Sequence, residues 1–259
     1  MMIEPRIEPG RRNFLIRMLA AGGGLLLAGC DRLSRTEWFV NILEGGEKLS
    51  HAAQHLVTSR KSMAQEFTEA DMSPFFRSNG TSNPDSPQYQ AFAANGFTDY
   101  RLEVSGLVEQ AASFSLAELR DLPSRTQITR HDCVEGWSAI GKWRGAKLSA
   151  LLEHVRPKPE ARYVVFYCAD PMDESGTQYY ESIDMEDAYH PQTILAYEMN
   201  DQPLPIANGA PIRVRIERQL GYKMAKYIMR IELVASFASI GDGKGGYWED
   251  QGYEWFAGI

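Results

Sequence analysis

One cysteine of this chain stands in a polar and aromatic stretch, where its sulfur can do chemistry. Cys133 lies within the run His131-Asp132-Cys133-Val134-Glu135-Gly136-Trp137-Ser138. Thiolate is a soft, strongly donating ligand and the reactive form of cysteine, so the setting indicates transition-metal binding or nucleophilic chemistry. On this octapeptide alone, a half-buried structural cysteine is the alternative.

Four further segments follow in order along the chain. They are Tyr179-Tyr180-Glu181-Ser182-Ile183-Asp184, Ile194-Leu195-Ala196-Tyr197-Glu198-Met199-Asn200, Asn208-Gly209-Ala210-Pro211-Ile212-Arg213 and Gly221-Tyr222-Lys223-Met224-Ala225-Lys226-Tyr227-Ile228. Together with the Cys133 motif they resemble the oxidoreductase molybdopterin-binding domain of the sulfite oxidase superfamily. The likeness is greater to its exported bacterial members, which include the catalytic subunit of the periplasmic methionine sulfoxide reductase. It extends over residues 75–234 and implies an enzyme.

The resemblance assigns a cofactor and its ligands. In that family one cysteine completes the coordination of molybdenum already held by two dithiolene sulfurs of molybdopterin, and Cys133 matches its position. The cofactor is therefore expected to be molybdenum-molybdopterin, with Cys133 as metal ligand and catalytic residue. Its phosphate needs cationic groups and N–H donors. The cofactor-binding residues implied are Asn79, Cys168, Asn208, Arg213, Met224, Ala225 and Lys226.

Some of these positions allow other interpretations. Without the resemblance, Arg213 would be a solvated charge on a strand. Cys168 falls where methionine sulfoxide reductase relatives carry a hydroxyl residue, and a disulfide with Cys133 is the structural alternative for both cysteines. Arg130 and His131 are predicted to act in catalysis or around the metal, with a simple hydrogen-bonded pair between His131 and Asp132 as the alternative.

The residues after the ligand separate this chain from the sulfite-oxidising relatives. Those relatives place an arginine soon after the ligand cysteine, in a Cys-Ala-Gly-Asn-Arg type of run. Here Val134-Glu135-Gly136-Trp137 follows Cys133. A sulfite pocket built in that way is therefore not supported.

The first thirty residues are typical of an export signal. Arg11-Arg12-Asn13-Phe14-Leu15 matches a twin-arginine signal, and Leu27-Ala28-Gly29-Cys30 matches a lipoprotein processing box. Twin-arginine export carries folded proteins, which suits a cofactor inserted in the cytoplasm. We expect a periplasmic protein, with a lipid anchor at Cys30 as a possibility and simple cleavage as the alternative.

Charge and composition limit the partners. Residues 1–30 contain four arginines and two glutamates, so the formal charge of −7 becomes −9 without them (−7 minus +2). An acidic chain argues against nucleic-acid binding. The sequence has three cysteines and no Cys-x-x-Cys-His haem motif. Electrons would therefore come from a separate partner, a membrane haem protein or a c-type cytochrome.

The elements that would position these residues are mostly strands. Alternation or apolar runs predict strands at residues 100–104, 126–130, 162–168, 212–217 and 227–234. A capping box from Ser115 to Glu118 predicts one short helix, and residues 147–155 predict another that ends before Pro157. The predicted class is α+β with a β-rich core, as a single molybdopterin-binding domain at residues 75–259. Residues 31–74 are predicted to be a tether and a surface helix.

Aromatic residues gather near the carboxyl end, among glycines. Residues 241–259 include Tyr247, Trp248, Tyr253, Trp255 and Phe256. We expect this segment to pack over the domain as a strap. Lining the entrance for the substrate is the alternative.

These observations predict oxygen-atom transfer. The substrate would be a sulfoxide of the methionine sulfoxide type or another small oxidised compound, reduced with electrons from the redox partner. One alternative is oxidation of a small sulfur compound with a cytochrome as acceptor. The other is a lipoprotein scaffold that kept the fold without an active metal. Metal content would separate the scaffold from both enzymes.

Overall fold

The computed structural model describes residues 36, 62–173 and 176–259. The chain divides into units at 1–59 and 60–259, and the second unit contains all the elements below. Among the described residues, no helix is both long and apolar enough to cross a membrane. The predicted export signal and lipid site at residues 1–30 lie outside the described residues.

The first sheet has five strands in the order β2 (Ala112–Ser115), β1 (Arg101–Gly106), β10 (Ile228–Val234), β5 (Tyr163–Pro171) and β6 (Gln178–Asp184). β1 pairs with β10 in parallel, and the other neighbours are antiparallel. In β1 the apolar Leu102 and Val104 alternate with exposed residues and point into the core. This sheet is therefore mixed; β1 buries one face, whereas consecutive residues of β5 and β6 are buried, so both of their faces are covered.

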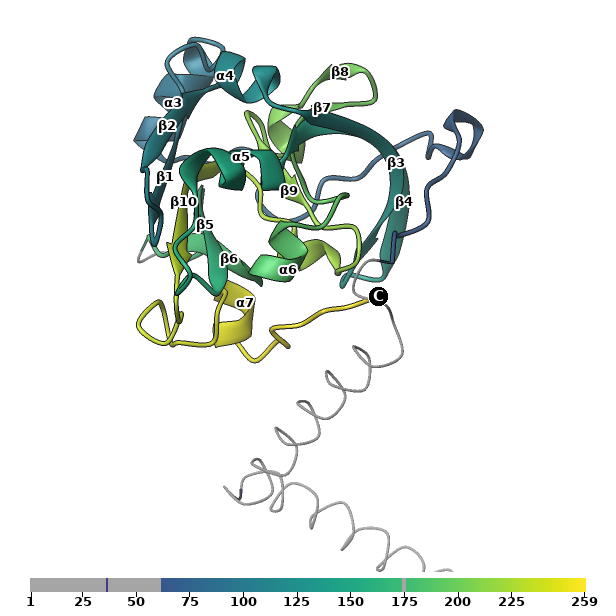
Figure 1. The fold of residues 1–259 in the computed structure, drawn as a ribbon. Coiled ribbons are helices and arrows are strands. Elements are labelled where there is room, and N and C mark those ends of the chain that lie inside the picture. The colour runs from purple at the N-terminus through teal and green to yellow at the C-terminus, as the bar shows by residue number, and fades with distance from the viewer. Residues whose placement is uncertain (1–35, 37–61, 174–175) are drawn as a thin grey trace, which may run out of the picture. The chain divides into compact units, whose positions relative to one another are not determined.

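The second sheet contains β3 (Ser124–Cys133), β4 (Trp137–Lys147), β7 (Ile194–Met199) and β8 (Gln202–Pro203) in that order. β9 (Arg213–Arg215) also pairs with β7. β3 and β4 form a long curved hairpin that closes one side of the molecule (Figure 1). The sheet thereby connects the Cys133 hairpin, through β4 and β7, to Arg213 on β9.

In the described part of the chain, helices are few and short. The α-helices are α3 (Pro87–Ala94), α4 (Leu116–Asp121), α5 (Leu148–Val155), α6 (Met185–Ala188) and α7 (Tyr247–Asp250), and the 3-10 turns are η1 (Glu69–Asp71), η2 (Ile206–Asn208) and η3 (Gly221–Lys223). α4 begins with the predicted capping box, in which the Glu118 N–H donates to Ser115 and Glu118 accepts from the Ser115 N–H. α5 buries Leu148, Leu151, Leu152 and Val155, which share one helical face.

The main core combines side chains from both sheets and from α5. Val164 and Phe166 of β5, Leu195 of β7 and Val214 of β9 belong to one buried cluster with the apolar face of α5. Burial of this surface is the main stabilising term of the domain. It also fixes the relative positions of β5 and β9, which both contribute to the site described below.

The predicted α+β class with a β-rich core is confirmed. The strands expected at residues 100–104, 126–130, 162–168 and 227–234 correspond to β1, β3, β5 and β10, and the strand expected at 212–217 is shorter, at Arg213–Arg215. β4 was not predicted, because Gly141 and Gly145 lower the strand propensity of its sequence.

Residues before 75 also contact the sheet. Glu66 forms an isolated bridge with Thr129 of β3, and the Ser73 N–H donates to the Ile140 carbonyl over 3.0 Å. Between residues 62 and 74 the only helical element described is η1 (Glu69–Asp71). The domain boundary at residue 75 stays a prediction.

Candidate active site

Cys133 is the last residue of β3, at the tip of the hairpin with β4. It pairs with Trp137, and residues 134–136 form the turn between them. Gly136 has φ of 85°, a left-handed conformation that glycine adopts without strain, and its N–H donates to the Cys133 carbonyl over 3.0 Å. The glycine of the motif thus makes the tight turn that holds the cysteine at the end of the sheet.

The Cys133 thiol lines an open cavity of about 760 Å³, a volume that includes its solvent-exposed mouth. The lining comes from segments far apart in the sequence. They supply Asn79, Gly80, Thr81, Cys133, Val134, Glu135, Asp170, Met172, Tyr179, Gly221, Tyr222, Met224, Ala225, Lys226, Trp248 and Tyr253. The pKa of the Cys133 thiol is raised above its usual value, mainly by burial. A bound metal cation favours the thiolate instead.

Five of the predicted site residues meet at this cavity. Asn79, Cys133, Met224, Ala225 and Lys226 all line it. The Lys226 ammonium donates to the carbonyls of Asn79, over 2.5 Å, and of Thr81, which fastens the turn-rich loop to the segment after η3. Lys226 therefore positions the loop around residue 79.

Arg213 lies directly behind this wall. It is fully buried, and its guanidinium donates to the carbonyls of Asn208 and Met224, each over 3.1 Å. Its carbon Cζ lies 5.3 Å from the Trp143 ring centroid, a cation–π contact. Burial, followed by the charge of Arg215, lowers the pKa of Arg213 to about 9, so it remains a cation at neutral pH.

The cations of this region differ in whether a carboxylate neutralises them. Arg215 pairs with Glu217 over 2.7 Å, and Lys223 pairs with Glu181 and Glu249, each over 2.5 Å. Within the described residues, Arg213 and Lys226 form no ion pair, although both are buried. Buried charges are costly unless they are compensated. Burial, followed by the charge of Arg213, lowers the pKa of Lys226 to about 7, whereas Arg213 stays charged at neutral pH. A bound anionic group would neutralise Arg213 and would raise the pKa of Lys226.

Unsatisfied donors support the same conclusion. Nε of Arg213, Nδ2 of Asn208 and Nε2 of His131 are buried and have no hydrogen-bond partner among the described residues. Such groups are rare in folded proteins and call for a bound acceptor. The phosphate and the polar pterin edges of molybdopterin supply acceptors for the Arg213 and Asn208 donors, so these residues fit that cofactor, whereas Nε2 of His131 lies against Gly221. The site is that of a protein that binds an anionic cofactor beside a cysteine sulfur.

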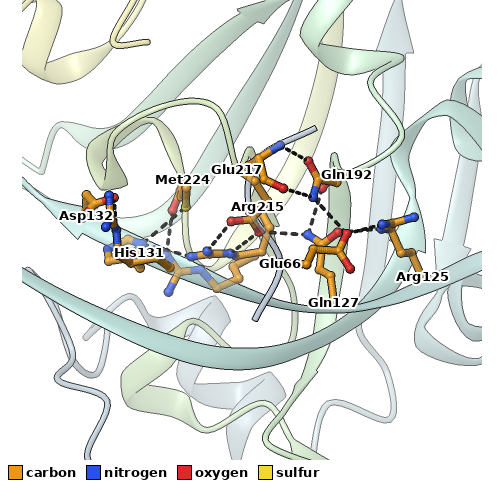
Figure 2. A network of polar contacts seen from close by, with 12 residues as sticks. Glu66, Arg125, Gln127, His131, Asp132, Gln192, Arg215, Glu217 and Met224 are labelled. Carbon is orange, nitrogen blue, oxygen red and sulfur yellow. Dashed lines mark hydrogen bonds and ion pairs between the residues drawn. The ribbon is translucent and has the colours of Figure 1, made fainter. Parts of the chain in front are cut away.

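His131 belongs to a buried network rather than to the cavity lining (Figure 2). Arg215 donates to Nδ1 of His131 over 2.9 Å and to both oxygens of Glu217, and Gln127 also donates to Glu217. Burial, then the charges of Arg215, Arg213 and Lys226, lower the pKa of His131 well below its usual range. The ring is therefore neutral, and Nδ1 is the acceptor.

This network positions the cavity wall. A Cβ on Gly221 would lie 2.5 Å from the His131 ring, so the close approach of η3 to β3 requires glycine there. Arg130 points elsewhere: its exposed side chain pairs with Asp132 over 2.9 Å and lines a smaller pocket with Thr129. The catalytic roles of Arg130 and His131 stay predictions, and the geometry favours a positioning role for His131.

Cys168 is buried in β5 and is not part of the cavity lining. Both Cys133 and Cys168 are free thiols in the structure. Burial and the nearby Asp170 raise the pKa of Cys168 well above its usual range, so the thiol is neutral. The charge of Lys226 opposes this shift, and direct contact of Cys168 with a cofactor stays a prediction.

Among the lining residues, Asp170 was not predicted from the sequence, and a lining role for Trp248 and Tyr253 was only the alternative to a strap. Asp170 lies within an irregularity in the pairing of β5 with β6, between Tyr167 and Pro171, and such bulges re-aim side chains beside active sites. Trp248 and Tyr253 come from the carboxyl-terminal segment, which both packs over the domain and lines the cavity. The aromatic content was a signal for Trp248 and Tyr253, whereas nothing local marked Asp170.

Comparisons with known proteins agree with this site. The model of the oxidoreductase molybdopterin binding domain matches residues 89–239. The putative protein-methionine-sulfoxide reductase subunit YedZ1 of Azospira oryzae is 39% identical over 250 residues, which cover 96% of this chain and 88% of that protein. The protein-methionine-sulfoxide reductase catalytic subunit MsrP of Ralstonia nicotianae is 36% identical over 144 residues, which cover 52% of this chain and 44% of that protein. The solved sulfane dehydrogenase SoxCD of Paracoccus pantotrophus has a TM-score of 0.48 at 23% identity, covering 58% of this chain and 45% of that chain.

This chain belongs to the oxidoreductase molybdopterin-binding domain family. It is a molybdopterin-binding oxidoreductase, so the predicted family, cofactor and enzyme class are confirmed. The match to MsrP spans less than half of that relative's length. Within this chain the family match ends at residue 239, before the carboxyl-terminal segment that lines the cavity.

Proposed function

We propose that this protein reduces sulfoxides of the methionine sulfoxide type by oxygen-atom transfer. The observation that carries the proposal is the Cys133 sulfur in a cavity that Lys226 also lines, with the buried Arg213 behind it, neither basic residue being in an ion pair among the described residues. The similarity to relatives named as protein-methionine-sulfoxide reductase subunits supports the substrate class. The absence of an arginine in the run after Cys133 argues against a sulfite pocket of the family's type.

The overall reaction consumes two electrons and two protons: a sulfoxide becomes a thioether, and its oxygen leaves as water. When bound, the molybdenum cofactor supplies the two-electron oxygen-atom transfer chemistry. Cys133 would bind the metal, Arg213 and Lys226 would neutralise the phosphate, and Asn208 would donate to a pterin edge. The electrons would come from a membrane haem protein or a c-type cytochrome.

Asp170 is the residue best placed to supply a proton. Its carboxyl lines the cavity, is buried, and has an oxygen, Oδ1, without a hydrogen-bond partner among the described residues. Burial raises the pKa of Asp170 to about 6, against the opposing charge of Lys226. A general acid works best when its pKa lies near the operating pH. Asp170 would therefore donate a proton from its carboxyl to the oxygen that leaves the sulfoxide.

A pH profile tests this role. Because the acid must be protonated, kcat should fall as pH rises through about 6, or through a higher pH if the anionic cofactor raises the pKa further. Asp170→Asn should lower kcat by about 10²-fold and lose that limb of the profile. A variant that keeps the wild-type profile would show that Asp170 does not supply the proton.

The pH dependence of the unfolding free energy gives a second test of the Asp170 pKa. The folded-state pKa of Asp170 lies above its unfolded value of about 3.9, so the folded state binds more protons between these values. The unfolding free energy of the wild type should therefore decline as pH rises from about 4 to about 6. Asp170→Asn should lack this part of the decline. Thermal unfolding across this range measures the difference.

We also infer a periplasmic location. Arg11-Arg12-Asn13-Phe14-Leu15 and the run that ends in Cys30 support it, as does the need to insert the cofactor before export. A fusion of residues 1–40 to a reporter that requires the twin-arginine route tests this proposal. Export that is lost in Arg11→Lys/Arg12→Lys would support it, and export that persists would contradict it.

The function itself is tested with protein purified from a host that makes the cofactor. Reduction of a methionine sulfoxide peptide by a reduced viologen dye, with about one molybdenum per chain, is the expected result. If the protein instead oxidises a small sulfur compound with a cytochrome acceptor and reduces no sulfoxide, the proposed direction of the reaction is wrong. A well-folded protein without molybdenum and pterin would contradict the enzymatic function altogether.

A further inference from the structure

The last residues of the chain form a segment fastened to the first sheet and to the region after β9. We name residues 246–259, which form most of the strap predicted at residues 241–259, the C-terminal strap. Gly246 forms a bridge with Glu181 of β6, and Gly258 forms one with Gln219. The indole of Trp255 donates to Ser182 over 2.9 Å. Figure 1 shows α7, at the start of the strap, beside β6. The strap is therefore held at both ends.

A buried ionic cluster fixes the strap next to the cavity. Lys223 of η3 donates to Glu181 of β6 and to Glu249 of the strap, and all three side chains are buried. Burial raises the pKa of Glu181 well above its usual range, against the opposing charge of Lys223. Because Lys223 lies between the lining residues Tyr222 and Met224, the same cluster orients the strap and the cavity wall.

Three aromatic side chains form part of that wall. We name Tyr222, Trp248 and Tyr253 the aromatic wall; all three line the cavity. The ring centroids of Tyr253 lie 5.3 Å from those of both Tyr222 and Trp248. The Tyr222 hydroxyl donates to the Glu254 carbonyl over 2.6 Å, which ties the wall to the strap. These rings are thus packed against one another and presented as a preformed surface.

The cavity therefore carries two kinds of side chain. Cys133, Asp170 and Lys226 supply sulfur, an acid and a cation, whereas the aromatic wall and Met172 supply apolar and π surface. Aromatic rings contact sulfur and alkyl groups favourably, and their negative faces repel anions. A sulfoxide matches both parts, since its oxygen is polar and its carbon groups are apolar. A small oxyanion matches only the first part.

We propose that the aromatic wall is the substrate subsite that binds the sulfur and carbon groups of an alkyl sulfoxide, and that it selects such substrates over small oxyanions. This inference rests on the proposed function. The wall reaches the surface, because Tyr253 and the neighbouring lining residue Val134 are both exposed. A methionine sulfoxide side chain in an extended polypeptide can therefore enter. Trp248 and Tyr253 lie beyond the residues of the family match, whereas Tyr222 lies within it.

The test compares binding in matched variants of the holoprotein. Without a reductant the enzyme cannot turn over a sulfoxide, so calorimetry can measure the Kd of an N-acetylated methionine sulfoxide peptide directly. Tyr253→Ala removes a wall residue that is 42% exposed, and Tyr189→Ala removes a tyrosine that is 41% exposed and does not line the cavity. Trp248→Leu retains an apolar side chain and removes the π surface. Molybdenum content and Tm are measured for every variant.

We expect Tyr253→Ala and Trp248→Leu each to raise the Kd about tenfold, with unchanged molybdenum content, whereas Tyr189→Ala leaves the Kd unchanged. The ratio of kcat/KM for the sulfoxide to kcat/KM for chlorate should fall by a similar factor in both wall variants. If Trp248→Leu does not fold, Trp248→Phe and Tyr253→Ala retain the comparison.

Two results overturn the inference in distinguishable ways. If the wild type reduces the sulfoxide and both wall variants bind it as tightly as Tyr189→Ala does, the subsite is wrong and the proposed function stands. If the molybdenum-loaded wild type neither binds nor reduces the sulfoxide, the proposed function fails together with the subsite. The second result is visible in the wild type alone.

Discussion

We expect Cys133→Ser to lower turnover by more than about 100-fold while molybdenum and pterin remain bound. Changing a residue that only supports a metal ligand already costs about 10- to 100-fold, and Cys133 is predicted to be the ligand itself. The cofactor would still be held at Arg213 and Lys226, so its content should persist. Serine is close in size to cysteine, and residue 133 lies at the end of a strand, so the fold should remain.

The measurement combines sulfoxide reduction, elemental analysis and the electron paramagnetic resonance signal of molybdenum. Ser138→Ala is the control, because Ser138 is exposed in the same hairpin and does not line the cavity. The control should retain both turnover and signal. Wild-type turnover with an unchanged signal in Cys133→Ser would mean that this sulfur does not bind the metal.

Local sequence signals predicted the elements that depend on local physics. The capping box at Ser115 and Glu118 needs only four neighbouring residues, and the apolar run that became β5 marks a buried strand by itself. β4 forms a hairpin with β3 and also pairs with the distant β7, and a glycine-containing stretch does not reveal these pairings. Tertiary contacts there outweigh local propensity.

The site was predictable where a motif carries it and not where distant segments complete it. Cys133, Arg213 and Lys226 were identified from ordered motifs, and the structure places them in or behind one cavity wall. The alternative for Arg213, a solvated strand charge, is wrong, because the residue is fully buried. Asp170 depends on an irregularity in strand pairing, and Trp248 depends on Glu249 reaching Lys223 across the fold. Neither relationship can be seen in a linear sequence.

Lys226 and Lys223 lie three residues apart, and replacing each by methionine should affect a different property. Lys226→Met should mainly weaken cofactor binding, and Lys223→Met should mainly lower the stability of the fold. Lys226 has no carboxylate partner within the described residues, and it faces the cavity. Lys226→Met should weaken cofactor binding by about 10- to 100-fold, since a hydrogen bond to a charged group contributes about 1.5–3 kcal/mol. Molybdenum and pterin per chain should fall. The stability of the cofactor-free protein should change by about 1 kcal/mol or less, because water can reach the carbonyls of Asn79 and Thr81 in the open cavity.

Lys223→Met is the counterpart, because Lys223 lies between two buried carboxylates. Removing it leaves Glu181 and Glu249 without their cation, which should cost about 3–5 kcal/mol of unfolding free energy. Adding Glu249→Gln to Lys223→Met should recover part of that loss, because it removes one of the uncompensated carboxylates. Denaturant unfolding of cofactor-free protein, with molybdenum measured on separately loaded samples, resolves both effects. Equal cofactor loss in the two single variants, with equal stability, would show that Lys226 has no special role toward the anionic cofactor.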